Sequence, residues 1–188
     1  SVVTGPSNGS ITNGNTSTPT YMPGGNFNGT DTFTFKVRDG ALFSSPATVT
    51  INVSAVNDAP SATAQTVSTA EDTAKTITLS GTDPEGSSLT YTVVTGPSNG
   101  TIANGNTSTP IYTPSGNFNG TDTFTFKVND GSLDSGAATV TVNVSAVNDA
   151  PSATAQTVTT AEDTAKTITL SGTDPEGSSL TYTVVTGP

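Results

Sequence analysis

The 188-residue chain contains no cysteine, no histidine and no tryptophan. Without cysteine it can form no disulfide framework, no zinc finger and no thiol nucleophile. Without histidine it also lacks the side chain that most often activates a nucleophile, and no glycine-rich phosphate loop follows a strand and opens a helix. We therefore expect a protein that is not an enzyme.

The chain is also poor in charged and in apolar residues, at 11% and 31% of the sequence. Fifteen acidic residues against five basic ones give a net charge of -10. This balance disfavours nucleic acid and anionic membrane surfaces as partners and favours divalent cations. No secretion signal and no hydrophobic run long enough to span a membrane is present, so we expect no membrane insertion and export directed from outside these residues.

The chain does contain a long internal repeat. Residues 92–188 reproduce residues 1–97 at an offset of 91, with 13 differences in the 97 superimposed positions. Solenoid units usually run ~20–50 residues, whereas ~90 residues can enclose a small core alone, so each repeat is a small domain. The recurring sequence AVNDAP marks the boundary between repeats. The predicted divisions are residues 1–56, the C-terminal part of one repeat (strands C to G); residues 57–147, a complete repeat; and residues 148–188, the N-terminal part of the next (strands A to C).

Alternation of apolar and polar residues predicts strands. TFTFKV at residues 123–128 and ATVTVNV at residues 138–144 place an apolar group at every second position, a period that a disordered low-complexity tract does not need. Seven short strands separated by turn residues predict an all-β, seven-stranded immunoglobulin-like sandwich. The strands expected in the complete repeat are A near 63–69, B 74–80, C 88–94, D near 101, E 110–113, F 122–129 and G 136–147. The expected core is Ile77, Leu79, Leu89, Tyr91, Val93, Ile102, Phe124, Phe126, Val128, Val140, Val142 and Val144, with Thr125 and Lys127 facing water.

Strand alternation also sorts the acidic residues between the two ends of each sandwich, because every second loop lies at the same end. The set expected at the second junction is Glu71, Asp72, Asp122, Asn148 and Asp149, met by Asp174 and Glu176 of the following domain. The set expected at the first junction is Asp31, Asn57, Asp58, Asp83, Glu85 and Asp130. Calcium takes 6–8 oxygen ligands at ~2.3–2.6 Å, which such a ring can supply. Each motif taken singly is also an ordinary polar turn, and only their convergence favours calcium.

Five motifs carry a resemblance to a known family. They are AED at 70–72, TDPEG at 82–86, LTYTVV at 89–94, NFNGTDTFTFKVNDG at 117–131 and AVNDAP at 146–151. Together they resemble the cadherin-like or immunoglobulin-like tandem repeats of large bacterial surface proteins and adhesins. The resemblance implies an extracellular location and calcium ligands: Glu71 from the A–B loop, Asp83 and Glu85 from the B–C loop, Asp130 at the end of strand F, and Asn57 and Asp58 from the linker. The acidic pair that cadherins carry before strand F is reduced here to Asp122, which favours one or two ions per junction.

Three functions remain open from the sequence. The first is a structural module in a calcium-stiffened stalk or fibre of an extracellular protein, whose adhesion ligand binds through regions outside this chain. The second is a self-assembling filament, because residues 148–188 carry strands A to C and residues 1–56 carry the later strands of the sandwich, so that one copy could complete another by strand addition. The third is a domain that itself binds glycan or protein, which we rank last because the loops are near copies and aromatic residues are few.

Overall fold

The computed structural model describes residues 1–186 of the chain. Every regular element in these residues is a β-strand, and none is a helix. Accordingly, the described residues hold no helix of the length and apolar character that a membrane crossing needs. The predicted all-β class is confirmed. The chain divides into two compact units, residues 1–59 with 83–87 and residues 60–82 with 88–188, which are described separately. The division at repeat boundaries, into 1–56, 57–147 and 148–188, stays a prediction.

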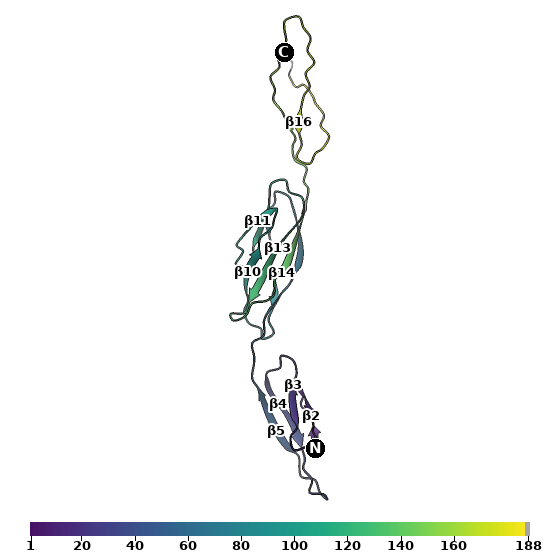
Figure 1. Cartoon of the computed structure of the whole chain (residues 1–188), viewed down its shortest axis with the longest axis vertical. Coiled ribbons are helices and arrows are strands. Elements are labelled where there is room, and N and C mark those ends of the chain that lie inside the picture. Colours follow the sequence, from purple (N-terminus) through teal and green to yellow (C-terminus); the bar gives the residue numbers. More distant parts are fainter. Residues whose placement is uncertain (187–188) are drawn as a thin grey trace. The chain divides into compact units, whose positions relative to one another are not determined.

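The first unit holds five strands (Figure 1). Strands β1 (Val2–Thr4), β4 (Gly29–Phe35) and β5 (Ala47–Val53) form an antiparallel sheet in the order β1-β4-β5. Strands β2 (Gly9–Thr12) and β3 (Thr20–Pro23) form an antiparallel hairpin. Since β5 stands last in its sheet, one of its edges has no strand partner among the described residues.

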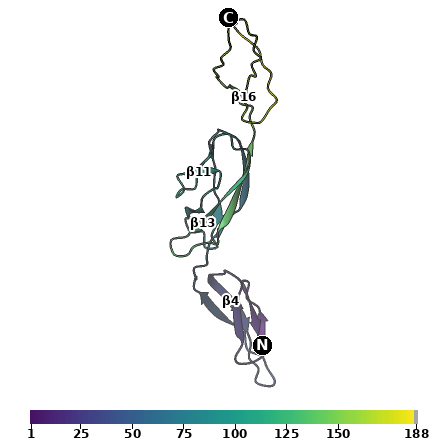
Figure 2. The same ribbon diagram turned by 45° about the horizontal axis from the view of Figure 1, so that its top comes forward.

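The second unit contains the complete sandwich (Figures 1 and 2). One sheet has the order β10-β13-β14-β7, and the other has the order β11-β12-β8. Strand β7 pairs with β14 in parallel, while the neighbouring pairs are antiparallel. The strands of the two sheets are β10 (Thr90–Thr95), β13 (Gly120–Asn129), β14 (Ala138–Ser145), β7 (Gln65–Ala70), β11 (Gly100–Ala103), β12 (Ile111–Pro114) and β8 (Lys75–Thr76).

Two short strand pairs complete the second unit. Strand β6 (Ser61–Ala62) pairs with β9 (Gly81–Thr82), and β15 (Ser152–Ala153) pairs with β16 (Gly172–Thr173). These two pairs occupy matching positions in successive repeats. The predicted strand A corresponds to β7, and β6 is an additional short strand before it, because the two pair with different partners, β14 and β9.

Predicted strand B is shorter than expected, since only Lys75–Thr76 forms a strand. The residues after it still follow the neighbouring segment: the amide of Ile77 donates to the carbonyl of Pro110 at 2.9 Å, and that of Leu79 donates to Ser108 at 2.8 Å. Every second amide is bonded in this way, which holds Ile77 and Leu79 in the core without a continuous ladder.

Most of the predicted core is confirmed. Its fully buried members in the second unit are Ile77, Leu79, Phe124, Phe126, Val128, Val140, Val142 and Val144, and the predicted residues Leu89, Tyr91, Val93 and Ile102 pack against them half-buried. The prediction missed Tyr112 and Ala138, which are buried as well. The prediction that Thr125 faces water is wrong, because its hydroxyl is buried. The reason is its central strand, which places Thr125 between Thr95 and Thr139 of the two neighbouring strands.

Candidate metal centre

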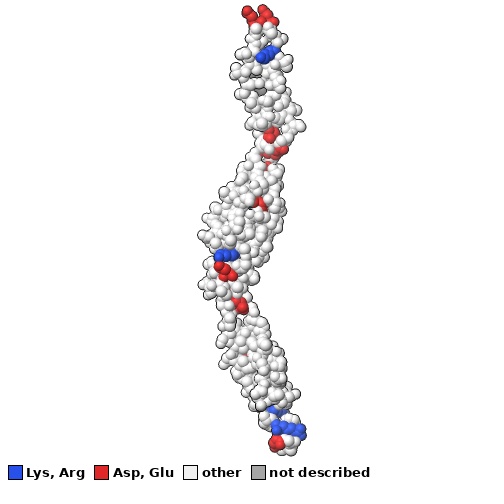
Figure 3. Space-filling view, viewed as in Figure 1, with Lys and Arg blue, Asp and Glu red and all other residues white. Residues whose placement is uncertain are grey.

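Three carboxylates from distant parts of the sequence meet in the second unit. Glu71, Asp149 and Glu176 each place an oxygen within 4.8 Å of the others. Glu71 follows the end of β7, Asp149 lies after β14, and Glu176 lies in the loop after β16. In the space-filling view, acidic atoms gather in a few small groups on a surface that carries little other charge (Figure 3). The cluster of Glu71, Asp149 and Glu176 is the candidate metal centre.

Glu71 is the buried member of the cluster, with 2% of its surface exposed. The parallel pairing of β7 with β14 ends at Ala70 and Ser145, and the amide of Glu71 continues it by donating to the carbonyl of Ser145 at 2.9 Å. One carboxylate oxygen, Oε1, accepts a short hydrogen bond from the amide of Val147. The other, Oε2, is buried and has no hydrogen-bond partner. A buried carboxylate oxygen without a donor is costly unless a cation is present.

The other two carboxylates of the cluster, Asp149 and Glu176, also have buried oxygens without a hydrogen-bond partner. The amide of Asp149 donates to Oε2 of Glu176 at 3.0 Å. The remaining oxygens, Oδ2 of Asp149 and Oε1 of Glu176, are buried and have no partner. Each of the three clustered carboxylates therefore has one orphaned buried oxygen, which is an unusual concentration in a folded protein.

The electrostatics of the cluster confirm that negative charge is crowded there. The pKa of Asp149 is raised above its usual value, first by desolvation and then by the nearby charges of Glu176, Asp72, Glu71 and Asp174. Four neighbouring carboxylates thus raise the pKa of Asp149, and no basic side chain contributes to the shift. Both desolvation and like charge disfavour the ionised form, so that a bound cation would relieve the site.

The other acids of this junction contribute through their turns. Asp174 accepts the amide of Ser178 on Oδ1 at 2.9 Å. Asp72 has a left-handed backbone, with φ of 55°, and accepts the amide of Asn117 on Oδ1 at 3.2 Å. The side-chain amide of Asn148 donates to the carbonyl of Asp149 at 3.3 Å. These residues shape the loops around the cluster, and the two aspartates add negative charge to it.

The first linker reproduces half of this geometry within the first unit. The amide of Asp58 donates to Oε2 of Glu85 at 3.0 Å, the same length as the matching bond in the second linker. Asp83 accepts the amides of Glu85 and Ser87 on Oδ1, while its Oδ2 is buried without a partner. Asn57 donates from its side chain to the carbonyl of Asp58 at 3.5 Å.

Asp122 lies outside the three-carboxylate cluster, although the sequence placed it there. It is 4% exposed, and both its oxygens are engaged: Oδ1 accepts the amides of Ser98 and Thr123, and Oδ2 accepts the amide of Asn99 and the hydroxyl of Tyr112. With four donors at 2.9–3.1 Å, this carboxylate needs no cation. It ties the turn before β11 to the start of β13.

Asp31 has the same role in the first unit. It accepts the amides of Ser7, Asn8 and Thr32 and the hydroxyl of Tyr21. Desolvation pushes its pKa upward, but the hydrogen bonds from Ser7, Asn8 and Thr32 outweigh this effect and leave the pKa below its usual value. The charge on Asp31 is thus satisfied inside the domain.

Asp130 is engaged in its own hairpin. Its Oδ1 accepts the amides of Ser132 and Leu133 at 2.6 and 2.7 Å, which closes the turn between β13 and β14. It is not part of the three-carboxylate cluster.

The sequence reading also missed the tyrosine that completes the Asp122 site. Tyr112 lies ten residues before Asp122, and the same spacing recurs between Tyr21 and Asp31, which was the available signal. Gly100 belongs to the same arrangement, because a Cβ at this position would lie 2.7 Å from the Tyr112 ring. Only glycine therefore lets the ring pack against β11.

The chain belongs to the bacterial Ig domain family. The family model described as Bacterial Ig domain matches residues 1–52 and 57–143, which makes this a tandem array of bacterial Ig domains. Domains of this family are typical of surface and secreted proteins. No curated protein matches the chain.

Several solved structures are similar to the chain at low identity. The endo-fucoidan hydrolase MfFcnA4 from glycoside hydrolase family 107 is 26% identical, with a TM-score of 0.40 over 78% of this chain and 23% of that one. Human mucin-like protocadherin EC1-2 is 20% identical, with a TM-score of 0.41 over 63% of this chain and 69% of that one. Protocadherin gammaB7 EC3-6 is 18% identical, with a TM-score of 0.48 over 84% of this chain and 44% of that one. The chain spans less than a quarter of the hydrolase's length.

Proposed function

We propose that this chain is a structural module of a large extracellular bacterial protein, in which tandem Ig domains form a stalk that calcium stiffens and that supports cell adhesion. The observation that carries the proposal is the cluster of Glu71, Asp149 and Glu176, each with a buried carboxylate oxygen that lacks a donor. These oxygens come from a domain, from the linker after it and from the next repeat. A cation bound there would join all three.

The donor set favours calcium among the biological cations. Glu71, Asp149 and Glu176 would hold the ion, with Asp72 and Asp174 close enough to add charge. All of these groups are carboxylates, which suit hard cations, whereas zinc and copper sites use the histidine and cysteine that this chain lacks. Backbone carbonyls and water can complete the 6–8 oxygens that calcium takes. One or two ions at this junction fit the number of acids.

The first linker would hold calcium by the same chemistry in a longer array. Asp58, Asp83 and Glu85 stand there as Asp149, Asp174 and Glu176 do in the second linker, and Asn57 matches Asn148. A domain preceding residue 1 would have to supply the counterpart of Glu71.

We also propose that the module is not an enzyme and acts through its neighbours. Its partners would be adjoining repeats of the same protein, and any cell-surface or matrix ligand would bind elsewhere in that protein. The support is chemical: the chain has no histidine or cysteine, and its acids are engaged in turns or in the linker clusters.

Calcium titration of the whole chain tests the proposal. Calorimetry should detect binding with a dissociation constant of about 10⁻⁴–10⁻³ M, the range of extracellular calcium modules. At 100 times that constant, calcium should stabilise the second unit by about 2.7 kcal/mol, and a chelator should reverse the effect. Small-angle scattering should show a narrower range of chain dimensions with calcium. Absence of both heat and thermal shift at millimolar calcium would refute the proposal.

The matched variants are Glu71→Gln and Glu162→Gln. These glutamates occupy the same position in successive repeats, but Glu162 is exposed. Glu71→Gln should weaken calcium binding at least about tenfold, since it removes a buried charged ligand, while Glu162→Gln should leave binding unchanged. With chelator present, Glu71→Gln should be at least as stable as the parent, because the repulsion is smaller. Equal calcium affinity in the two variants would remove Glu71 from the site.

A further inference from the structure

The two copies of the repeat differ most in one hairpin loop. The loop between β4 and β5 includes residues 38–46, and the matching loop of the second unit includes residues 129–137. Five of the 13 differences between the superimposed repeats fall within these positions. They are Arg38/Asn129, Ala41/Ser132, Phe43/Asp134, Ser45/Gly136 and Pro46/Ala137. The near identity of the loops, which ranked glycan binding last from the sequence, therefore has an exception here.

Both hairpins nevertheless have the same closed turn. Oδ1 of Asp39 accepts the amides of Ala41 and Leu42 at 2.9 and 2.8 Å, and Asp130 closes the second hairpin in the same way. The differences thus change the side chains that a fixed turn presents. A ligand would meet groups that are already in place, which lowers the entropy cost of binding.

In the second unit the hairpin neutralises its own basic side chain. Lys127 pairs with Asp134, and the side chain of Asn129 donates to the same carboxylate at 2.8 Å. The pKa of Asp134 is lowered first by the hydrogen bond from Lys127 and then by that from Asn129. The charges that shift this pKa are those of Lys127 and Asp130, both on the same hairpin. The electrostatics of the hairpin are therefore local, even in a complete domain.

In the first unit the same positions hold a cationic and aromatic pair. Phe43 stands in place of Asp134, and Arg38 stands in place of Asn129. The guanidinium carbon of Arg38 lies 5.2 Å from the centroid of the Phe43 ring. The acid that neutralises the second hairpin is thus absent from the first, whose one acidic residue is engaged by its own turn.

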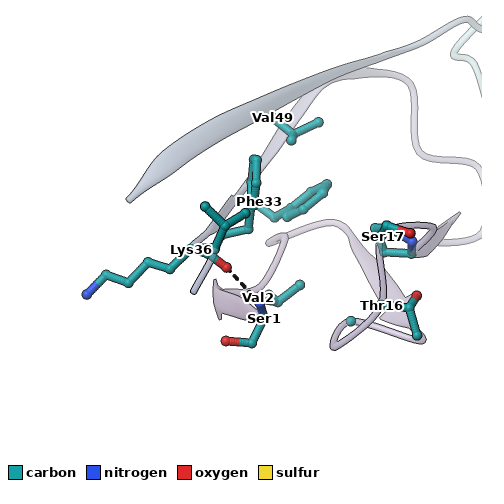
Figure 4. Close-up of a pocket in the computed structure, with 11 residues that line it drawn as sticks. Ser1, Val2, Thr16, Ser17, Phe33, Lys36 and Val49 are labelled. Atoms are coloured by element: carbon teal, nitrogen blue, oxygen red, sulfur yellow. Dashed lines mark hydrogen bonds between the residues drawn. The ribbon is translucent and has the colours of Figure 1, made fainter. Parts of the chain in front are cut away.

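A second basic side chain, Lys36, belongs to the same group. Figure 4 shows it extending away from Phe33 and Val49, which border a cavity of about 320 Å³. Neither Lys36 nor Arg38 forms an ion pair within residues 1–186. Two of the five basic residues of the chain therefore gather unpaired on one hairpin. Basic atoms form a patch at the lower end of the space-filling view (Figure 3).

These three positions face solvent in a complete domain as well. Phe43 is 61% exposed, and the side chain of its counterpart Asp134 is 46% exposed in the second unit. The side chain of Lys127, which matches Lys36, is 37% exposed there. The exposure of the group is therefore a property of the hairpin and does not require any strand to be missing.

We propose that the β4–β5 hairpin of the first unit binds an anionic polysaccharide through Lys36, Arg38 and Phe43. The two basic side chains pair with carboxylate or sulfate groups of the polymer, and the guanidinium can form two parallel hydrogen bonds to one such group. The exposed ring packs against the apolar C–H face of a sugar. The proposed function places the adhesion ligand outside this chain, and the hairpin site is additional to that ligand and independent of calcium.

A polysaccharide fits this group better than a nucleic acid or a protein does. Duplex DNA carries one charge per about 1.7 Å and is held by many basic contacts, whereas this hairpin offers two on a chain with a net charge of -10. A stable protein interface covers about 800 Å² on each partner around an apolar centre, which three side chains at a turn do not supply. One charged sugar needs only a ring and one or two cations.

Residue-resolved NMR titration of the whole chain tests the proposal. A chelator is present, so that calcium cannot bridge two anionic molecules. The probes are oligosaccharides of dextran sulfate and of galacturonate, with neutral dextran oligosaccharides as the control. One or both anionic probes should shift the amide signals of residues 36–44 and not those of residues 127–135, and the tighter probe identifies the anionic group. No shift at residues 36–44, or equal shifts with neutral dextran, would overturn the proposal.

Exchange of the paired residues between the two hairpins is the sharpest variant test. Arg38→Asn with Phe43→Asp gives the first hairpin the pair of the second, and should weaken binding at least about tenfold. Asn129→Arg with Asp134→Phe makes the converse exchange, and should create a second site at residues 127–135. The same spectra report whether each variant is folded. Unchanged binding after the first exchange, or no second site after the converse one, would overturn the proposal.

Lys75→Gln is the control for net charge. Lys75 is exposed and lies outside the hairpin, so this variant should bind as the parent does, whereas Arg38→Gln should bind at least about tenfold more weakly. Equal loss in the two variants would mean general attraction of anions and would overturn the site. A short DNA duplex should bind at least about tenfold more weakly than the tighter oligosaccharide. Equal binding of DNA would overturn the assignment to a polysaccharide.

Discussion

Two copies of nearly the same sequence reach different degrees of burial in this molecule. Phe124 is 1% exposed and Phe126 is fully buried, whereas the equivalent Phe33 is 6% exposed and Phe35 is half-buried beside an open cleft. The hydrogen bonds around the buried aspartate, by contrast, are the same in both copies. The tyrosine to aspartate bond measures 3.0 Å in the first unit and 3.1 Å in the second.

The comparison distinguishes two effects: a pair of strands is enough to form the local hydrogen bonds, whereas burial of the core needs a complete sandwich. Hairpins and turns form in both copies because their hydrogen bonds join residues close in sequence or on adjacent strands. Exclusion of water needs the second sheet and the parallel strand β7, which only the second unit has in full. Desolvation accordingly raises the pKa of Tyr112 to about 12, with help from the hydrogen bond and charge of Asp122. The pKa of Tyr21 is raised by the same causes.

The largest effect expected from this comparison is the loss of a core phenylalanine. Phe124→Ala should lower the free energy of unfolding of the second unit by about 3–5 kcal/mol, because it leaves a cavity in a closed core. Phe33→Ala should cost the first unit clearly less, since Phe33 already borders an open cleft. Hydrogen exchange followed peptide by peptide can measure each unit separately. Equal costs would show that the cleft of the first unit is filled in solution.

A smaller effect should follow from removing the buried phenol. Tyr112→Phe should cost about 1–3 kcal/mol, because Asp122 loses one of its four donors in a site without water. Tyr21→Phe should cost less, because Tyr21 is half-buried whereas Tyr112 is fully buried, so that solvent can reach the first phenol. Urea unfolding of the two variants checks the order. A larger cost for Tyr21→Phe would contradict the burial argument.

Alkaline pH should separate the same two tyrosines. A phenol whose folded pKa lies above its unfolded value contributes stability that is present below about pH 10 and is lost as pH rises through the folded pKa. For Tyr112 this window extends from about 10 to about 12. The second unit should therefore lose stability across this range, and Tyr112→Phe should flatten the profile. An identical slope in the parent and in Tyr112→Phe would contradict the assignment.

The smallest effect concerns the hairpins, where the two copies differ in sequence. In the second unit Lys127 pairs with Asp134 at 2.5 Å, and this bond, followed by that from Asn129, lowers the pKa of Asp134. In the first unit the matching residue to Asp134 is Phe43, and Arg38 lies 5.2 Å from its ring centroid. Asp134→Ala should lower the stability of the second unit only slightly, and by less at high salt, because the ion pair is exposed to solvent.

Phe43→Ala should cost a similar amount, about 0.5–1 kcal/mol at this exposed site, with weaker dependence on salt because the ring carries no net charge. Thermal melts at low and high salt measure both variants. If the two variants showed the same salt dependence, the contrast between an ion pair in one hairpin and a cation–ring contact in the other would be contradicted.

Much of the fold could be predicted from the sequence because its patterns are local. The alternation of apolar and polar residues predicted β13 and β14, and turn residues marked the boundaries between strands. The all-β class and most core residues therefore follow from the amino-acid sequence. The additional short strand β6 did not follow, because it depends on pairing with β9 elsewhere in the chain. The short β8 is of the same kind, since its pairing stops at Ile111, the residue at which β12 begins.

The candidate site shows the same division. Net charge, the alternation of predicted strands and the family resemblance together predicted acidic junctions that bind calcium. Only the tertiary structure decided which acids converge: Glu71, Asp149 and Glu176 meet because parallel pairing of β7 with β14 brings the end of β7 to the linker. Asp122, which the sequence predicted at the same junction, instead accepts hydrogen bonds from four donors inside the domain. Spacing along a chain determines which residues share a strand, but the energy of a carboxylate depends on the donors and charges that other strands bring to it.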